Sequence, residues 1–228
     1  MDDLKAIEKI DFYELKLLKE KSFASRALIV ENDLKTGEVE SKVGEHILNK
    51  IKLKVDLDNP DIIIFTYIYR NNCYVGIDFS GDISKREYKI FSNPISLKGT
   101  IAYALVRIAD YKKEETLVDP FCGSGEIVIE SALFVCDFPV CFFDKRKFPF
   151  LKIVKDFNFE KIDKKISKMK TQIFCFDREH RFVKSAEKNA KIAGINKQTK
   201  FSRVDLGWLE LKFKKKTVDK IVTNIPRS

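Results

Sequence analysis

The stretch Leu117-Val118-Asp119-Pro120-Phe121-Cys122-Gly123-Ser124-Gly125-Glu126 decides the fold of this chain. An apolar run ends at Asp119, a turn of small residues with two glycines follows, and apolar residues resume at Ile127. This order predicts a short strand, a tight turn and a helix. Glycine has no Cβ, so such a corner lets backbone amides and the free N–H groups at a helix start approach a ligand closely.

Three more strands are expected after this corner, at residues 172–176, 199–204 and 217–223, with a helix over 178–193. Alternating strands and helices predict a parallel sheet with right-handed crossovers and helices on both faces. The strands end at polar residues, namely Asp119, Asp177, Asp205 and Asn224. Ligands of such sheets bind at the carboxyl ends of the strands, so we expect these side chains to share a cleft.

The glycine turn excludes two common ligand classes. It lacks the Gly-Lys-Ser/Thr ending of a phosphate-binding loop, and no third glycine completes the spacing of a dinucleotide site. We therefore expect Gly123 and Gly125 to present amides to the methionine carboxylate of S-adenosylmethionine. Cys122 lies in the same turn and is expected to be a small turn residue rather than a nucleophile.

The other strand ends fit the same cofactor. Asp177 could accept both ribose hydroxyls, although it could also cap the helix that follows. Asp205 could accept a hydrogen bond from the adenine amino group, with a solvated turn carboxylate as the alternative.

Asn224-Ile225-Pro226 suits chemistry on an exocyclic base amine, whose lone pair is delocalised into the ring. The Asn224 side-chain oxygen and the Ile225 carbonyl could each accept one amine hydrogen and aim the lone pair at a methyl donor. Pro226 would stiffen the loop. Asn224 and Pro226 are thus the expected catalytic residues, and the alternative is an ordinary turn at a strand end.

The first part of the chain has a different pattern. Helical spacing covers residues 5–19, a strand is expected at 22–30, and Val39, Val43, Ile47 and Ile51 mark one face of a second helix. Strands are expected at 61–69 and 73–79. We place a small α+β domain at 1–92 and a Rossmann-like domain at 93–228, with an aromatic and basic insertion over 137–170 that ends in a Lys-rich helix.

The composition of the chain favours some classes of binding partner over others. The 228 residues carry a net charge of +9 with a pI of about 9.1, which suits a polyanion such as nucleic acid. No apolar run reaches the roughly 18 residues of a membrane span, and the charged N-terminus lacks a signal-type core, so a cytoplasmic protein without membrane contact is expected. The five cysteines form no C-x-x-C pair, so no metal is expected.

The chain stops just past the expected fourth parallel strand, whereas such sheets normally continue. We therefore expect an incomplete Rossmann-like domain that a missing C-terminal segment or a second polypeptide would complete.

Several segments resemble a known family. Ser22–Arg26, Val43–Ile47 and Tyr74–Gly81 are similar to a THUMP RNA-binding domain, and Lys85–Tyr88 with Pro94–Thr100 resembles its join to a methyltransferase domain. The series Asp119-Pro120-Phe121-Cys122-Gly123-Ser124-Gly125 with Asn224-Ile225-Pro226 resembles the THUMP-containing guanine-N2 methyltransferases of tRNA and large-subunit rRNA, above all the tRNA position-6 enzymes.

The resemblance implies that the first domain grips tRNA and that the second methylates a guanine turned out of its stack. It assigns the cofactor site to Asp119, Pro120, Cys122, Gly123, Gly125, Asp177, Asp205 and Asn224. Arg227 departs from the family, which has an aromatic residue there. The alternatives are the same chemistry on rRNA or on adenine, and a non-catalytic RNA-binding protein that keeps an incomplete methyltransferase fold.

Overall fold

The computed structural model describes residues 20–94, 96–154 and 156–226. The helix expected over 5–19 and Arg227 lie outside these residues. The chain forms two compact units. One comprises Met1–Gly81 with Arg146–Phe157, and the other comprises Asp82–Lys145 with Asn158–Ser228.

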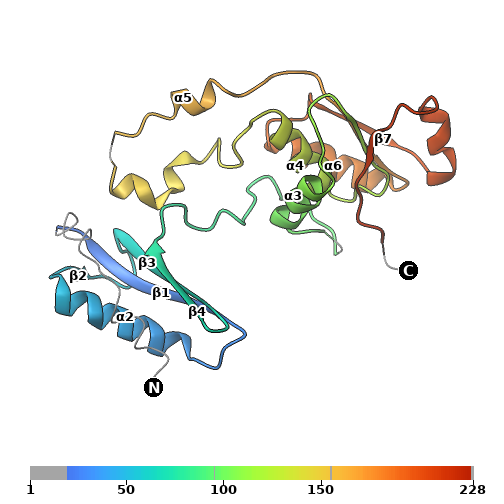
Figure 1. Ribbon diagram of the computed structural model, residues 1–228. Coiled ribbons are helices and arrows are strands. Elements are labelled where there is room, and N and C mark those ends of the chain that lie inside the picture. The colour runs from blue at the N-terminus through green and yellow to red at the C-terminus, as the bar shows by residue number, and fades with distance from the viewer. Residues whose placement is uncertain (1–19, 95, 155, 227–228) are drawn as a thin grey trace. The chain divides into compact units, whose positions relative to one another are not determined.

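The first unit is a four-stranded sheet with a helix on it (Figure 1). Its elements are β1 (Ser22–Val30), α2 (Thr36–Lys50), β2 (Lys54–Val55), β3 (Ile62–Tyr69) and β4 (Asn72–Ile77). The strand order is β2-β1-β3-β4; β1 runs parallel to both neighbours, and β3 and β4 form an antiparallel hairpin. The strands predicted at 22–30, 61–69 and 73–79 are confirmed to within two residues at each end, and the helix marked by its apolar residues is confirmed as α2.

The core of the first unit lies between α2 and one face of the sheet. Val39, Val43 and Ile47 recur every four residues of α2 and are completely buried. They pack with alternate residues of β3, since side chains of a strand point to opposite faces in turn. The apolar residues that recur every four positions in the sequence therefore form this core, as expected.

The insertion after α4 divides between the two units. Arg146–Phe157, with the 3-10 helices η3 (Lys145–Lys147) and η4 (Pro149–Lys152) over its first part, belongs to the first unit. The Lys152 ammonium donates to the carbonyl of Pro60 at 2.6 Å and to Asn59 Oδ1 at 3.1 Å. The backbone N–H of Phe150 donates to the backbone carbonyl of Phe79 at 3.3 Å. The insertion thus supplies a segment to the domain that precedes it.

The second unit is a Rossmann-like domain with a parallel sheet in the order β7-β6-β5-β8. Its remaining elements are α3 (Gly99–Ile108), β5 (Thr116–Asp119), α4 (Glu126–Val135), α5 (Glu160–Asp163), β6 (Gln172–Asp177), α6 (His180–Ile192), β7 (Thr199–Arg203), η5 (Leu206–Lys212) and β8 (Lys220–Ile221). No helix in the described part of the chain is long and apolar enough to cross a bilayer.

Helices on both faces of this sheet were expected, but in the described residues the α-helices lie on one face and the other face carries only the 3-10 helix η5. Helices α3, α4 and α6 pack in one apolar cluster with Leu117 and Ile173. The other face, which includes Val118 and Phe176, packs against η5 and the loop after it. The chain moves in one direction from β5 to β6 to β7, and right-handed crossovers then place both connecting helices on the same side. The return from β7 to β8 runs on the opposite face.

Two other predicted elements, a helix and a strand, are shorter in the structure than expected. The Lys-rich helix predicted to end at Lys170 is only the single turn α5, because its apolar residue Ile162 remains 41% exposed and no buried face supports a longer helix. The strand predicted over 217–223 pairs with β5 only at Lys220 and Ile221.

The structural boundary falls after Gly81 rather than after residue 92. A buried ion pair explains why the segment 82–92 belongs to the second unit. Arg86 Nε donates to Glu130 Oε1 of α4 at 2.6 Å, and the two side chains are 7% and 1% exposed. The Tyr88 hydroxyl donates to the same oxygen at 2.7 Å. The segment 82–92, which we placed in the first domain, is therefore fixed to the core of the second.

Replacing Arg86 by alanine should destabilise the second unit by about 3–5 kcal/mol, because Glu130 would keep a buried charge without its partner. Urea unfolding followed by circular dichroism would measure the loss. The matched control is Arg70→Ala, which breaks the exposed pair with Glu31 and should cost at most about 1 kcal/mol. Equal losses in the two variants would contradict a structural role for the buried pair.

Candidate active site

The candidate site lies where the sheet order reverses. Strands β5 and β8 are neighbours, although β5 is followed in the chain by β6 on its other side. Such a switch point opens a crevice at the carboxyl ends of the strands. Asp119 ends β5, Asp177 ends the adjacent β6, and Asn224 follows β8.

The glycine turn is shaped by positive φ angles and close packing. Gly123 has φ 53° and Gly125 has φ 87°, a region in which side chains are strained. A Cβ atom on Gly125 would lie 2.7 Å from the Cβ of Ala186 in α6. The Gly125 amide donates to the carbonyl of Cys122 at 2.8 Å, and α4 begins at the next residue. The two glycines are therefore structural requirements of this corner.

Asp177 fastens this turn to the sheet. Its Oδ2 accepts from the Gly123 amide at 3.1 Å, and its Oδ1 accepts from the Glu179 amide at 2.9 Å. The residue that precedes α6 is Glu179, so Asp177 forms a turn before the helix rather than its N-cap. The Gly123 amide is thus already used within the protein. Each Asp177 oxygen retains a second lone pair for a further donor.

Asp119 is the most perturbed carboxyl of the site. Burial raises its pKa to about 7, and the nearby carboxylates of Asp177 and Glu126 act in the same direction. Hydrogen bonds to Oδ1 from the Thr223 hydroxyl at 2.6 Å and from the Phe121 amide at 3.2 Å oppose this shift. An acid with such a pKa in a pocket is a candidate for ligand contact.

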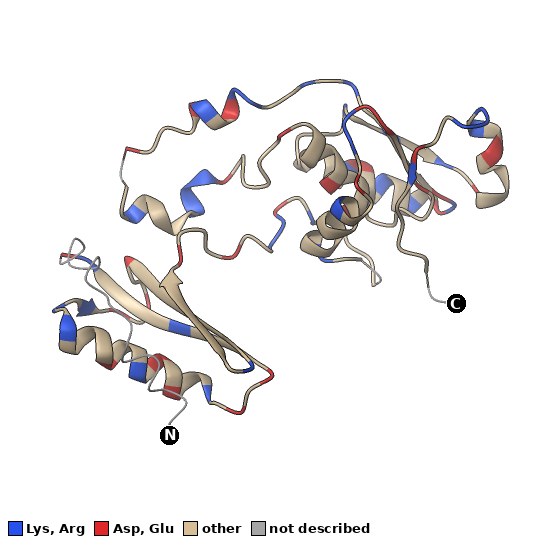
Figure 2. Ribbon diagram, in the orientation of Figure 1, with Lys and Arg blue, Asp and Glu red and all other residues tan. Residues whose placement is uncertain are grey.

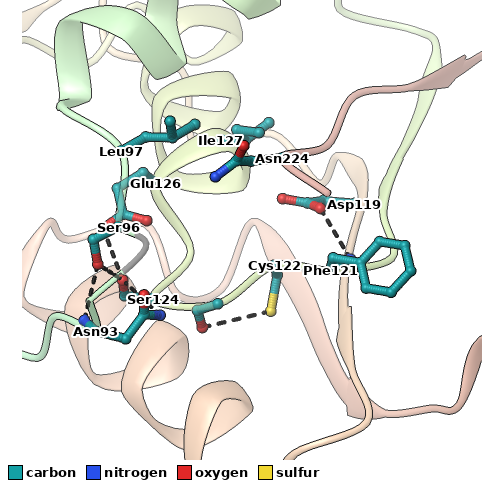
Figure 3. A pocket seen from close by; sticks show the side chains of 11 residues that line it. Asn93, Ser96, Leu97, Asp119, Phe121, Cys122, Ser124, Glu126, Ile127 and Asn224 are labelled. Carbon is teal, nitrogen blue, oxygen red and sulfur yellow. Dashed lines mark hydrogen bonds between the residues drawn. The ribbon is translucent and has the colours of Figure 1, made fainter. Parts of the chain in front are cut away.

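A small pocket with about 20 Å³ of free volume opens beside Asp119, and Figure 3 shows the side chains of Asp119 and Asn224 near each other at this pocket. Its lining also includes Cys122 and Gly123. The hydrogen bond with Cys175 favours the thiolate of Cys122, but burial and neighbouring carboxylates outweigh it and raise the pKa of this thiol. The Cys122 thiol is therefore protonated at neutral pH and lines the wall of the pocket.

The remaining predicted site residues lie around this pocket without lining it. Asp205 is exposed just beyond the end of β7, and its Oδ1 accepts from the Gly207 amide at 3.0 Å as the cap of η5. Pro120 is buried in the turn, and Pro226 is exposed after Asn224. The structure therefore brings together Asp119, Cys122, Gly123, Asp177 and Asn224, and it leaves Asp205 at the same sheet edge with a capping bond.

Sequence reasoning missed a polar shell that fixes the turn. Asn189 of α6 is completely buried and donates to the carbonyls of Phe91 and Ser124, both at 2.9 Å. Ser124 Oγ donates to Glu126 at 2.8 Å, and it also hydrogen-bonds to Ser96 Oγ and to Asn93 Nδ2, the latter at 3.5 Å (Figure 3). These contacts depend on residues far apart in the chain.

We expect Gly125→Ala to destabilise the second unit by about 1–3 kcal/mol, because the new methyl group meets Ala186 and the backbone is left-handed. Thermal unfolding would detect the loss. The same substitution at Gly44 in α2 is the control, since nothing lies within 4 Å of a Cβ there and alanine should stabilise the helix by about 0.5–1 kcal/mol. A Gly125→Ala protein as stable as the native chain would show that the turn adapts.

The Asp119 carboxyl should make stability depend on pH. Its pKa rises from 3.8 to about 7 on folding, so the folded protein holds this proton more tightly than the unfolded chain. The free energy of unfolding should therefore fall as pH rises from about 4 to about 7 and stay level above that range. Comparing urea unfolding of the native protein with Asp119→Asn isolates this part, because asparagine cannot titrate. Parallel pH curves for the two proteins would exclude the shift.

Comparisons with known proteins agree with this geometry. Residues 86–227 match the RMKL-like methyltransferase domain family, and residues 11–78 match the THUMP domain family. The chain is 35% identical over 99% of its length to a tRNA (guanine(6)-N2)-methyltransferase of Methanocaldococcus jannaschii and 30% identical to the protein of that name from Archaeoglobus fulgidus. It spans 62% and 56% of the lengths of these two relatives.

A more distant relative is the ribosomal RNA large subunit methyltransferase K/L of Buchnera aphidicola, 26% identical over 75% of this chain and 26% of that protein. Among solved structures, SMU.472 complexed with SAH superposes with a TM-score of 0.73 at 20% identity, over 99% of this chain and 62% of that one. That likeness supports the fold. With a THUMP domain first and a match over more than half of its residues, the chain belongs to the RMKL-like methyltransferase family.

Proposed function

We propose that this protein is part of an S-adenosylmethionine-dependent RNA methyltransferase that modifies the exocyclic N2 amine of a guanine in tRNA. The observation that carries the proposal is the pocket at the switch point, which Asp119 and Asn224 both line. The names of the two relatives at 35% and 30% identity favour guanine N2 of tRNA. The more distant K/L relative keeps rRNA as the alternative substrate.

The residues present fit this cofactor. Asp119, Asp177 and Glu126 are 1%, 7% and 4% exposed, so three carboxyl groups are concentrated around one turn. Lys89 lies 3.6 Å from Glu126 and is the cation paired with this group. A ligand with a sulfonium, an ammonium and ribose hydroxyls supplies the cations and donors that such a site lacks. The small pocket marks where one end of this ligand would lie, with Asp177 and Asp205 farther along the sheet edge.

When bound, S-adenosylmethionine supplies a methyl group activated by the positive sulfur. The protein's own residues would make the exocyclic amine, a poor nucleophile, able to attack the methyl group. Asn224 Oδ1 and the Ile225 carbonyl would accept the two amine hydrogens, which draws the nitrogen lone pair out of conjugation with the ring. Neither acceptor takes up a proton at neutral pH, so the hydrogen that the amine loses would leave to water. Pro226 would limit the motion of this acceptor pair.

A methyl-transfer assay with nucleoside mass analysis tests the proposal. The chain is incubated with S-adenosylmethionine and bulk tRNA or rRNA, and the nucleosides are separated after digestion. N2-methylguanosine from tRNA is expected. Asn224→Ala should bind the cofactor in calorimetry within about threefold of the native affinity and lose turnover by about 100-fold or more, because the removed interaction serves the transition state.

Other outcomes assign other functions. Methyladenosine as the sole product would refute the guanine assignment, and modification of rRNA alone would refute the tRNA assignment. Retained tRNA binding without cofactor binding would favour an RNA-binding protein with a non-catalytic fold. A chain that binds cofactor but is inactive alone would point to a second polypeptide or a further C-terminal segment that completes the sheet.

A further inference from the structure

The Asp119–Thr223 hydrogen bond reaches from the acid of the pocket to the residue before Asn224. The Thr223 hydroxyl donates to Asp119 Oδ1 at 2.6 Å, although 104 residues separate the two in the chain. Asp119 ends β5 and is nearly inaccessible, whereas Thr223 follows β8 and is half-buried. Asp119 and Asn224 both line the pocket, where Figure 3 shows them near each other. A change in the state of Asp119 is therefore one hydrogen bond and one residue away from Asn224.

Backbone pairing on this side of the sheet is short and ends just before Thr223. Strand β8 pairs with β5 at Lys220 and Ile221, and the Val222 amide donates to the carbonyl of Val118 at 3.1 Å. The side chain of the next residue, Thr223, then contacts the end of β5. After so short a ladder, one side-chain hydrogen bond decides how firmly the following residues are held, because short pairings open at low free-energy cost.

The surroundings of Asp119 disfavour its charged form. Burial raises its pKa to about 7, and the carboxylates of Asp177 in β6 and Glu126 in α4 act in the same direction. The other ionisable groups nearby are the Cys122 and Cys175 thiols, and Lys89, which lies 3.6 Å from Glu126. On the β8 side, residues 221–226 carry no charge, and the stretch of chain that leads to the C label is tan in Figure 2. The Asp119 carboxyl is therefore protonated in a large fraction of molecules at neutral pH.

A cation bound in the pocket would change this state. Its charge favours the carboxylate, so Asp119 would release its proton to water. A hydrogen bond to a carboxylate is roughly twice as strong as one to a neutral acid, so the bond from Thr223 would tighten at the same time. S-adenosylmethionine carries a sulfonium and an ammonium, and in that respect the inference rests on the proposed function.

We propose that Thr223 is a positioning residue that links the cofactor pocket to the amine acceptor: a cofactor cation beside Asp119 tightens the Thr223 hydrogen bond, and the tightened bond holds Asn224 in place for the target guanine. The methyl donor and the base then bind cooperatively, because a coupling free energy between two sites acts equally in both directions. Asn224 touches the amine, and Thr223 acts through it. The cofactor thus has a second role beyond donating its methyl group, since it prepares the residue that receives the base.

A purely structural hydrogen bond is the alternative. It would satisfy the buried Asp119 carboxyl to the same extent with and without a ligand, and its loss would weaken the fold in both states alike. The two accounts differ in one observable quantity, which is the change that a ligand causes in the segment after β8.

Hydrogen exchange with mass spectrometry tests the coupling in the full chain. The probe is sinefungin, a cofactor analogue in which an amine-bearing carbon replaces the methylated sulfur, so it is cationic and transfers no methyl group. In the native protein, sinefungin should slow exchange of the backbone N–H groups of residues 222–225 by about tenfold. Thr223→Val keeps the side-chain shape without the hydroxyl; it should bind sinefungin within about fivefold of the native affinity and lose the added protection.

Three further variants separate the hydroxyl from packing. Thr223→Ser keeps the hydroxyl and should be protected as in the native chain. Thr223→Ala lacks both the hydroxyl and the methyl group and should match Thr223→Val, so the result does not depend on how valine packs. Thr217→Val is the control and should behave as the native chain, because that hydroxyl donates to the carbonyl of Lys214 at 2.9 Å in the exposed loop before β8.

Turnover gives a second measurement. With tRNA as substrate, Thr223→Val should lower kcat by about tenfold while KM for the cofactor changes by less than about fivefold, since the hydroxyl positions Asn224 and does not touch the cofactor. Thr223→Ser should restore kcat to within about twofold of the native value.

Equal protection by sinefungin in the native chain, Thr223→Val and Thr223→Ala would overturn the coupling. So would a loss of protection in Thr223→Ser as large as in Thr223→Val, because the hydroxyl would then not be the cause. A native chain that does not bind sinefungin would overturn the methyltransferase proposal together with the coupling. Hydroxyl-dependent protection without N2-methylguanosine in tRNA would overturn only the guanine assignment and leave the coupling in place.

Discussion

The hydrogen bond from the Thr223 hydroxyl to Asp119 Oδ1, 2.6 Å long, joins the two halves of the candidate active site. It connects the end of β5 to the residue before Asn224, across the point where the sheet order reverses. The β5–β8 ladder is only two residue pairs long, so backbone pairing alone holds this edge weakly. A carboxyl that is nearly inaccessible needs such a donor, because burial without one strongly disfavours its charge. This hydrogen bond therefore stabilises the buried Asp119 carboxyl and positions the side-chain amide of Asn224 beside it.

The glycine corner is held by an equally local balance. Gly125 lies so close to Ala186 that α4 and α6 can approach only because both residues are small. Two side chains then satisfy backbone hydrogen-bonding groups of the turn. Asp177 accepts a hydrogen bond from the Gly123 N–H, and Asn189 donates one to the Ser124 carbonyl. Buried polar groups of this kind specify a single arrangement when all are satisfied. The turn is thus determined by packing and hydrogen bonding together rather than by its own dihedral preferences.

How much could be predicted from the sequence depends on how far apart in the chain the interacting residues lie. The positions of most strands, the glycine turn and the apolar face of α2 depend on neighbours within a few residues, and these expectations were confirmed, although β8 is shorter than predicted. The side of the sheet on which α4 and α6 lie depends on strand order, which no local pattern encodes. The role of Asn189 could not be predicted from the sequence, because its partners Phe91 and Ser124 are 98 and 65 residues away. Asp205 carries the right residue type at the right edge, yet a capping bond to Gly207 already uses it.

The insertion shows why a domain boundary is hard to read from a chain. Its base is closed within the second unit by the ion pair of Lys145 with Asp163, and the Lys145 ammonium also lies 4.4 Å from the ring centroid of Phe142. Between these two residues the chain leaves that unit and contributes Arg146–Phe157 to the first one. The units are consequently joined by three covalent connections instead of one. Each added connection reduces the conformational entropy that separate domains would retain. A substitution in this segment would therefore act on the stability of the THUMP domain, although its neighbours in sequence belong to the methyltransferase domain.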